Sequence, residues 1–320
     1  MTNILMILFY VLIFPGFLFC FIAGLLLAGI DRKLVARMQR RIGPPILQPM
    51  YDFFKLLGKE TIVPRAASRK TFLIASTIGL ASLVATALFI PIAGFSAFAG
   101  VADIIVILYL LTIPAVSLIL GGAASGSPYA GVGISREMVA LMSYELPLVI
   151  ILLSIGKAVG NAMGGGITFS FTEICAYQMS FGPIISKWSM IPAAIAMLFV
   201  IPCEIGSRPF DIAEAETEIC EGPLVEYSGT PLAVFNLNHA IKMFIMTALF
   251  TSLFLGGFST GIFALDVLIF FVICVAITVI SITLLRAVTA RLKVEQVFKF
   301  YWSVVSGLAV LSLILVWLGL

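Results

Sequence analysis

A stretch between positions 203 and 229 concentrates the acidic side chains of an otherwise apolar sequence. Seven of the chain's sixteen Asp and Glu residues lie in this stretch, and Arg208 is its only basic residue. The seven are Glu204, Asp211, Glu214, Glu216, Glu218, Glu221 and Glu226. Neighbouring carboxyls repel when ionised, which raises their pKa values and lets them exchange protons near neutral pH as a coupled group. The pattern therefore predicts a proton relay, and a solvated acidic loop is the alternative.

Local signals predict a short helix for the middle of this stretch, from about Pro209 to Cys220. Proline suits the first helical turn, and the Gly222-Pro223 pair stops a helix. On such a helix four carboxylates share one face: Asp211, Glu214, Glu218 and Glu221.

The composition places the acidic stretch in a membrane protein. The chain is 61% hydrophobic and 11% charged, against about 25% charged residues in a soluble domain. The fold class is therefore an all-α polytopic membrane protein. Its five cysteines are scattered without a CxxC pair, and His239 is the single histidine, so no iron–sulfur cluster, zinc site or other metal site is expected in this chain.

We expect one membrane domain, residues 1–320, with about eight transmembrane helices. The predicted spans are 4–30, 71–92, 103–124, 136–156, 188–206, 232–257, 262–285 and 302–320. Ten Lys and Arg residues lie in 31–70 and four in 286–299. By the positive-inside rule both termini face outward, and the cytoplasmic loops are about 31–70, 125–135, 207–231 and 286–299.

Two segments of the predicted cytoplasmic side carry further patterns. Residues 46–59 have Leu47, Met50, Phe54 and Leu57 on one helical face, which predicts an amphipathic helix at the membrane surface or beneath a partner. Residues 121–135 are rich in small side chains, which fits either a flexible loop or a close backbone approach to a partner.

Ionisable residues inside spans are costly and are candidates for function. Glu145 lies within the fourth span, two turns past Glu137, and Glu204 ends the fifth. His239 and Lys242 share one face of the sixth. We expect Glu145 and Glu204 to extend the acidic path into the membrane, while a static pairing of the basic residues with one of these carboxyls is the alternative.

Three motifs in order resemble one known family. Asp31-Arg32-Lys33 with Arg40-Arg41-Ile42-Gly43-Pro44 resembles the first cytoplasmic loop of complex I subunit 1 (the H-subunit of the bacterial enzyme), Ser143-Tyr144-Glu145-Leu146-Pro147 its fourth span, and Arg208-Pro209-Phe210-Asp211 with the following glutamates its acidic loop. The eight-span layout matches too, so the resemblance covers essentially the whole chain. The form EICEGPLVEYSG looks closer to the membrane-bound [NiFe] hydrogenase branch, of the archaeal M-subunit type. A sulfur-reducing sibling complex and a quinone-binding subunit stay open, and a stand-alone transporter is a more distant alternative because no internal repeat is evident.

The resemblance implies a non-catalytic subunit of a multisubunit oxidoreductase, without a cofactor of its own. The [NiFe] site and iron–sulfur clusters would lie in soluble hydrogenase large and small subunits and an iron–sulfur subunit on the cytoplasmic face. Antiporter-like subunits and lipid would surround the chain in the cell membrane, ferredoxin would act indirectly, and no nucleic acid is expected. Electron transfer would drive H⁺ or Na⁺ outward through the carboxylates, with His239 and Lys242 passing the change laterally. Basic residues expected to dock the soluble partner are Arg32, Lys33, Arg37, Arg40, Arg41, Arg136 and Arg208.

Overall fold

The fold is a bundle of helices, and the predicted number of spans is confirmed. The computed structural model describes residues 2–95, 97–98, 103–164, 166–256 and 260–319, and in these ranges eight helical segments are long and apolar enough to cross a membrane. The spans are α1 (Thr2–Leu12) with α2 (Phe17–Met38); α4 (Arg69–Phe89); α5 (Ile104–Ser125); α6 (Pro128–Ala162); η2 (Trp188–Met190) with α8 (Ile191–Ile205); α10 (Gly229–Phe250) with the π-helix η4 (Thr251–Leu255); α11 (Phe263–Thr278) with the π-helix η5 (Val279–Thr283) and α12 (Leu284–Val288); and α13 (Val294–Phe300) with the π-helix η6 (Tyr301–Val305) and α14 (Ser306–Trp317).

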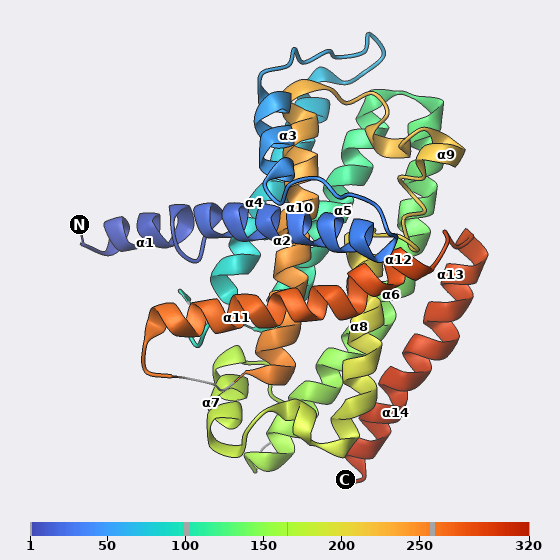
Figure 1. Ribbon diagram of the computed structural model, residues 1–320. Coiled ribbons are helices and arrows are strands. Elements are labelled where there is room, and N and C mark those ends of the chain that lie inside the picture. The colour runs from blue at the N-terminus through green and yellow to red at the C-terminus, as the bar shows by residue number, and fades with distance from the viewer. Residues whose placement is uncertain (1, 96, 99–102, 165, 257–259, 320) are drawn as a thin grey trace.

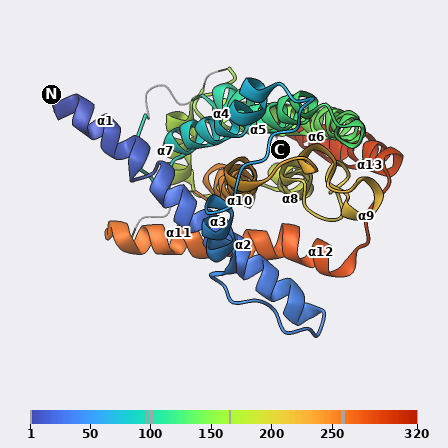
Figure 2. The same cartoon turned by 90° about the horizontal axis from the view of Figure 1, so that it is seen from above.

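The span of α10 is the centre of the bundle. Helices α4, α5 and α6 form one wall, α8 lies beside α10, and α2 and α11 cross α10 on the other side (Figures 1 and 2). In an apolar stretch of 18 residues from the span of α10 78% of the residues are buried, against 22% in the corresponding stretch of the N-terminal span. Lys242 on α10 is buried and needs a partner or water there, whereas His239, one turn earlier, keeps exposed surface.

Shorter helices lie between the spans. They are α3 (Gln48–Leu57), α7 (Phe171–Phe181), η1 (Ile184–Ser186), α9 (Glu216–Ile219) and η3 (Gly222–Leu224). The predicted amphipathic helix at 46–59 is confirmed as α3, which lies against α2 and α10. Met50 and Phe53 pack on the core of the chain, while Leu47, Phe54 and Leu57 stay exposed on the chain's own surface, where a membrane or a partner was expected to cover them.

The flexible loop considered for residues 121–135 is wrong, since α5 runs to Ser125, α6 begins at Pro128 and only the turn between them is irregular. Proline occupies the first turn of this helix, where its missing N–H is not needed. The small residues instead allow another part of this chain to come close. A Cβ at Gly133 would stand 2.5 Å from Cδ of Pro223, so helix α6 and the acidic segment touch at a point that admits no side chain.

The helix predicted over Pro209–Cys220 is also wrong. Helix α9 covers only Glu216–Ile219, and the residues before it form a turn in which the Ile212 amide donates to the Phe210 carbonyl. The Leu292 amide donates to the Pro209 carbonyl, which ties this turn to a segment about eighty positions away. Phe210, Ile212 and Ala215 are all buried, so the segment points apolar side chains inward without helical spacing.

Candidate functional site

Three neighbouring cavities meet at His239, and the acidic segment lines two of them. The inner cavity, of about 70 Å³, carries six ionisable side chains: Glu137, Glu204, Asp211, Glu214, His239 and Lys242. The loop chamber, of about 380 Å³, shares Asp211, Glu214 and His239 with it and adds Glu221. The side crevice, of about 180 Å³, opens between α2, α3 and α10 and shares His239 with both. Ionisable side chains from α6, α8, the acidic segment and α10 thus line adjoining cavities that share His239.

The inner cavity contains a buried ion pair between α8 and α10. Lys242 Nζ lies 2.9 Å from Glu204 Oε1, and the two side chains are 8% and 1% exposed. Of the two oxygens of this carboxylate, Oε2 has no hydrogen-bond partner among the described residues, and neither has Oδ1 of the neighbouring Asn238. Buried acceptors without donors are costly, so the cavity is a place for water or another hydrogen-bond donor. The static pairing considered for Lys242 is therefore present.

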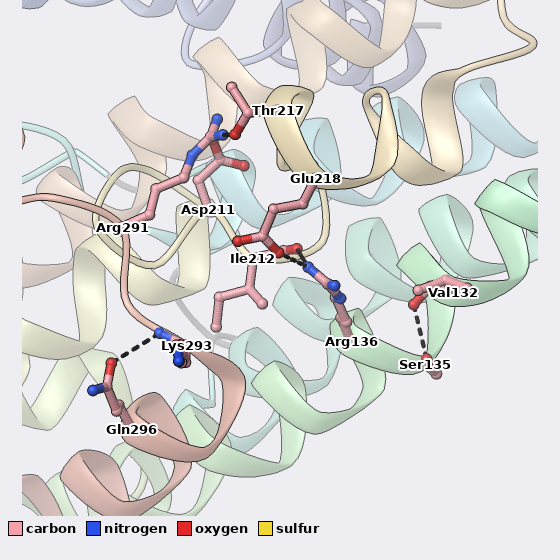
Figure 3. Close-up of polar contacts among 10 residues, drawn as sticks. All are labelled: Val132, Ser135, Arg136, Asp211, Ile212, Thr217, Glu218, Arg291, Lys293 and Gln296. Carbon is pink, nitrogen blue, oxygen red and sulfur yellow. Dashed lines mark hydrogen bonds and ion pairs between the residues drawn. The ribbon is translucent and has the colours of Figure 1, made fainter.

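Two arginines from distant segments hold the acidic segment in place (Figure 3). Arg291 donates to Asp211 Oδ2 at 2.8 Å and to the Thr217 hydroxyl at 3.1 Å. Arg136 on α6 donates to Glu218 Oε2 at 2.6 Å and to the Ile212 carbonyl at 3.4 Å. Asp211 and Glu218 therefore leave the single helical face that was predicted for them and take separate partners on opposite sides of the segment.

Glu214 is a carboxyl of this segment whose pKa is raised. Burial, followed by the nearby charges of Asp211, Glu137 and Glu221, raises its pKa to about 8, while Lys242 acts in the opposite direction. A carboxyl with this pKa carries its proton for most of the time at neutral pH, yet can release it when a neighbouring charge changes.

The structure separates the remaining relay candidates. Glu145 is half-buried on α6 and lies outside the lining of the three cavities, and Glu226 is exposed. Glu218 is 55% exposed on its side chain, paired with Arg136. The side chain of Glu216 lies outside the described residues.

Two groups escaped the sequence-based selection. Glu137 lines the inner cavity, although its position at the start of a predicted span was noted. Asp31 is 3% exposed and accepts hydrogen bonds from Thr283 and from Arg286, the latter at 2.7 Å, so it joins α2 to η5 and α12 at the side crevice. The helical spacing of Glu137 and Glu145 was a usable signal, whereas nothing local marks the pair of Asp31 with Arg286.

The predicted docking residues also divide into two groups. Arg37, Arg40 and Arg41 are exposed after the buried part of α2, and Lys33 is half-buried. Arg32 lies 3.2 Å from Asp52 in a half-exposed pair, while Arg136 and Arg208 face acids of the same chain. Among the predicted docking residues, those that are exposed and form no ion pair with a described residue therefore lie at and just after the end of α2.

Comparison with known proteins agrees with this architecture. The sequence matches the NADH dehydrogenase family over residues 9–317. It is 34% identical over 312 residues to the H-subunit of NADH-quinone oxidoreductase from Thermomicrobium roseum, covering 88% of this chain and 87% of the relative. It is 35% identical over 231 residues to hydrogenase-4 component C of Escherichia coli K12, covering 72% and 70%.

A solved structure has the same fold. A chain in the membrane-bound sulfane sulfur reductase (MBS), an archaeal respiratory membrane complex, superimposes with a TM-score of 0.88 at 29% identity, covering 99% of this chain and all of that one. Eight spans around an enclosed ionisable cavity define a multi-pass membrane protein. The chain belongs to the NADH dehydrogenase family, whose members include subunit 1 of complex I and its bacterial counterpart, the H-subunit.

Proposed function

We propose that this chain is the membrane subunit that anchors the soluble arm of an energy-converting redox complex and couples its electron transfer to H⁺ or Na⁺ translocation. The observation that carries the proposal is the convergence of carboxyls from α6, α8 and the acidic segment with His239 and Lys242 around two adjoining cavities. Exposed Arg37, Arg40 and Arg41 dock the soluble arm on the cytoplasmic face, and both termini lie on the outer side.

The coupling step begins at the acidic segment. A charge change in the docked arm alters the pKa of Glu214, and each pKa unit corresponds to about 1.4 kcal/mol. The ion pair of Glu204 with Lys242 then responds to the new charge on Glu214. Glu145, which lies two turns past Glu137 on α6, transmits the change of charge towards mid-membrane. His239 and Lys242 on α10 pass it laterally to antiporter-like partners.

The hydrogenase branch is the form of complex that we favour. The identity to hydrogenase-4 component C and the EICEGPLVEYSG form of the acidic segment support it. Reduced ferredoxin then delivers electrons indirectly, and the [NiFe] site and iron–sulfur clusters belong to soluble partner subunits.

The test uses the intact complex in sealed vesicles, with hydrogen evolution and ion uptake measured together. Asp211→Asn and Glu145→Gln are expected to lower ions moved per hydrogen formed several-fold, because each removes a carboxyl of the path. Glu226→Gln, on an exposed carboxyl, is the matched control and keeps the wild-type ratio. A wild-type ratio of ions moved to hydrogen formed in both Asp211→Asn and Glu145→Gln contradicts the relay. Docking is tested separately with the double variant Arg40→Glu, Arg41→Glu, which is expected to lose assembly with the soluble arm.

A second function is favoured by one observation, the side crevice beside α3. Phe53, Leu56 and Met243 give it apolar surface, and Asp31 and Arg286 give it a polar end, as a quinone headgroup and tail require. In that case the complex reduces a quinone, and Met243→Trp is expected to abolish quinone reduction. If Met243→Trp leaves the activity of the complex unchanged and the purified complex contains no nickel, the sulfur-reducing form of the complex is favoured instead.

A further inference from the structure

A groove outside the three cavities lies between α4 and α10, on the side of the basic loops. It has a volume of about 360 Å³, and its walls include Arg69 and Leu73 from α4, Val234 from α10 and Val63 from the segment between α3 and α4. Two contacts fix its shape. Asn238 Nδ2 donates to the Ser76 carbonyl at 3.0 Å, which joins α4 and α10 at the bottom, and the Ile62 amide donates to Ser228 Oγ at 2.9 Å, which pins the covering segment at the top.

The groove changes from basic to apolar along its length. Arg69, Leu73 and Thr77 follow one another on one face of α4 at helical spacing, so the groove descends about 12 Å from the rim of the span. Arg69 is exposed at the rim. Below it, Leu73 and Val234 are half-buried and apolar.

The basic residues near the rim have no acidic partner among the described residues. Arg69, which lines the groove, and the nearby Lys59 and Arg65 form no ion pair there, and all three are exposed. The hydroxyls of Thr61 and Thr230 also border the groove and make no hydrogen bond to other described residues. A phosphate accepts hydrogen bonds from arginine and hydroxyl groups, so the rim is complementary to an anionic headgroup.

We propose that this groove binds one anionic phospholipid of the leaflet next to the basic loops. Its phosphate contacts Arg69 and Thr230, and the start of an acyl chain lies along Leu73 and Val234. The position at the first turns of two spans places the rim at the depth of lipid headgroups. This inference is independent of the proposed coupling function, since the groove shares no residue with the three cavities.

The test measures lipid retention by the intact complex. The complex is reconstituted into vesicles of phosphatidylcholine with a minor fraction of phosphatidylglycerol, and the lipids kept after extraction are counted by native mass spectrometry. Arg69→Gln is expected to weaken phosphatidylglycerol binding about fivefold, the effect of one basic residue near an anionic lipid. Thr77→Trp fills the groove and leaves the charge of Arg69 intact. The complex with this variant is expected to retain one phosphatidylglycerol fewer than the wild type.

Lys70→Gln is the matched control, because it removes the same charge from the next residue of α4 outside the groove, and it is expected to retain lipid as the wild type does. Equal retention in all four forms overturns the proposal. Replacement of phosphatidylglycerol by phosphatidylcholine without loss of occupancy overturns the anionic preference. Loss of a membrane subunit, rather than a lipid, from Thr77→Trp overturns it in favour of a protein partner.

Discussion

The two ends of the helix bundle use their charges differently. At the end that carries the acidic segment, Lys242–Glu204 and Arg291–Asp211 are buried or half-buried pairs beside cavities of up to about 380 Å³. At the opposite end, Lys157 and Lys187 lie over the rings of Trp317 and Tyr177, with Nζ 4.9 and 4.8 Å from the ring centroids. A cavity there beside Gln178 has only about 30 Å³.

The difference shows where the bundle can respond to a change of charge. A cation over an aromatic ring is a stable contact that has no titrating partner. A buried pair next to open space can exchange protons, water or partners, and its energy depends on both groups being charged. The acidic end can therefore respond to a change of charge, whereas the contacts at the opposite end hold their helices in fixed positions. Three variants test that contrast.

Removing the cation from the buried pair is expected to have the greatest effect. Lys242→Met leaves the Glu204 carboxylate enclosed without its ion-pair partner, which is expected to cost about 3–5 kcal/mol of unfolding free energy. The double variant with Glu204→Gln is expected to recover most of this loss, because no uncompensated charge remains. Thermal unfolding of the purified complex measures both, and a single variant as stable as the wild type contradicts the pairing.

Removing the carboxyl of Glu214 is expected to change the pH dependence of stability. Its pKa is about 8 in the folded chain, above the ordinary value of 4.5, so between these pH values the folded chain holds a proton that the unfolded chain releases. The contribution of Glu214 to stability is therefore greatest below pH 4.5 and is lost as pH rises towards about 8.

Glu214→Gln should flatten this part of the curve of unfolding midpoint against pH. Glu226→Gln, at an exposed carboxyl, serves as its control and should leave the curve as in the wild type. Parallel curves for the wild type and Glu214→Gln show that Glu214 ionises normally, which removes it from the relay.

A change at the opposite end is expected to have the smallest effect. Trp317→Leu removes the ring beneath Lys157, and a partly exposed contact of this kind is worth about 0.5–1 kcal/mol. The ratio of ions moved to electrons transferred should not change, because this end holds none of the proposed relay groups. An altered ratio in vesicles means that the two ends are coupled and that the contrast drawn between them is wrong.

The spans were predictable because a run of about twenty apolar residues can cross a bilayer as a helix whatever its neighbours are. The residues that line the inner cavity were predictable in part, since Glu204, His239 and Lys242 stand out in the sequence as ionisable residues in apolar surroundings. The conformation of the acidic segment was not predictable from local signals. Helical spacing is real between Asp211 and Glu218, yet Arg291 and Arg136 lie about eighty positions from them and decide where each points.

The same reason explains the groups that were missed. Arg286 is 255 positions from Asp31, so their pairing depends entirely on how α12 returns to α2. Glu137 was noted at the start of the predicted fourth span, but nothing in the sequence showed that it would line a cavity. The early start of α6, at Pro128, places Glu137 more than two turns inside the helix and beside the inner cavity.

The contact between Gly133 and the acidic segment has a mechanical consequence. Gly222 has φ of +51°, and a Cβ there would stand 2.2 Å from the Ala213 carbonyl oxygen, so neither glycine can be replaced without moving backbone. Close backbone packing therefore fixes the position of the segment where it meets α6, and the ion pairs of Arg136 with Glu218 and of Arg291 with Asp211 fix it on both sides. A side chain at either glycine would push the segment away from α6 and would change the walls of the loop chamber, which Asp211, Glu214 and Glu221 line.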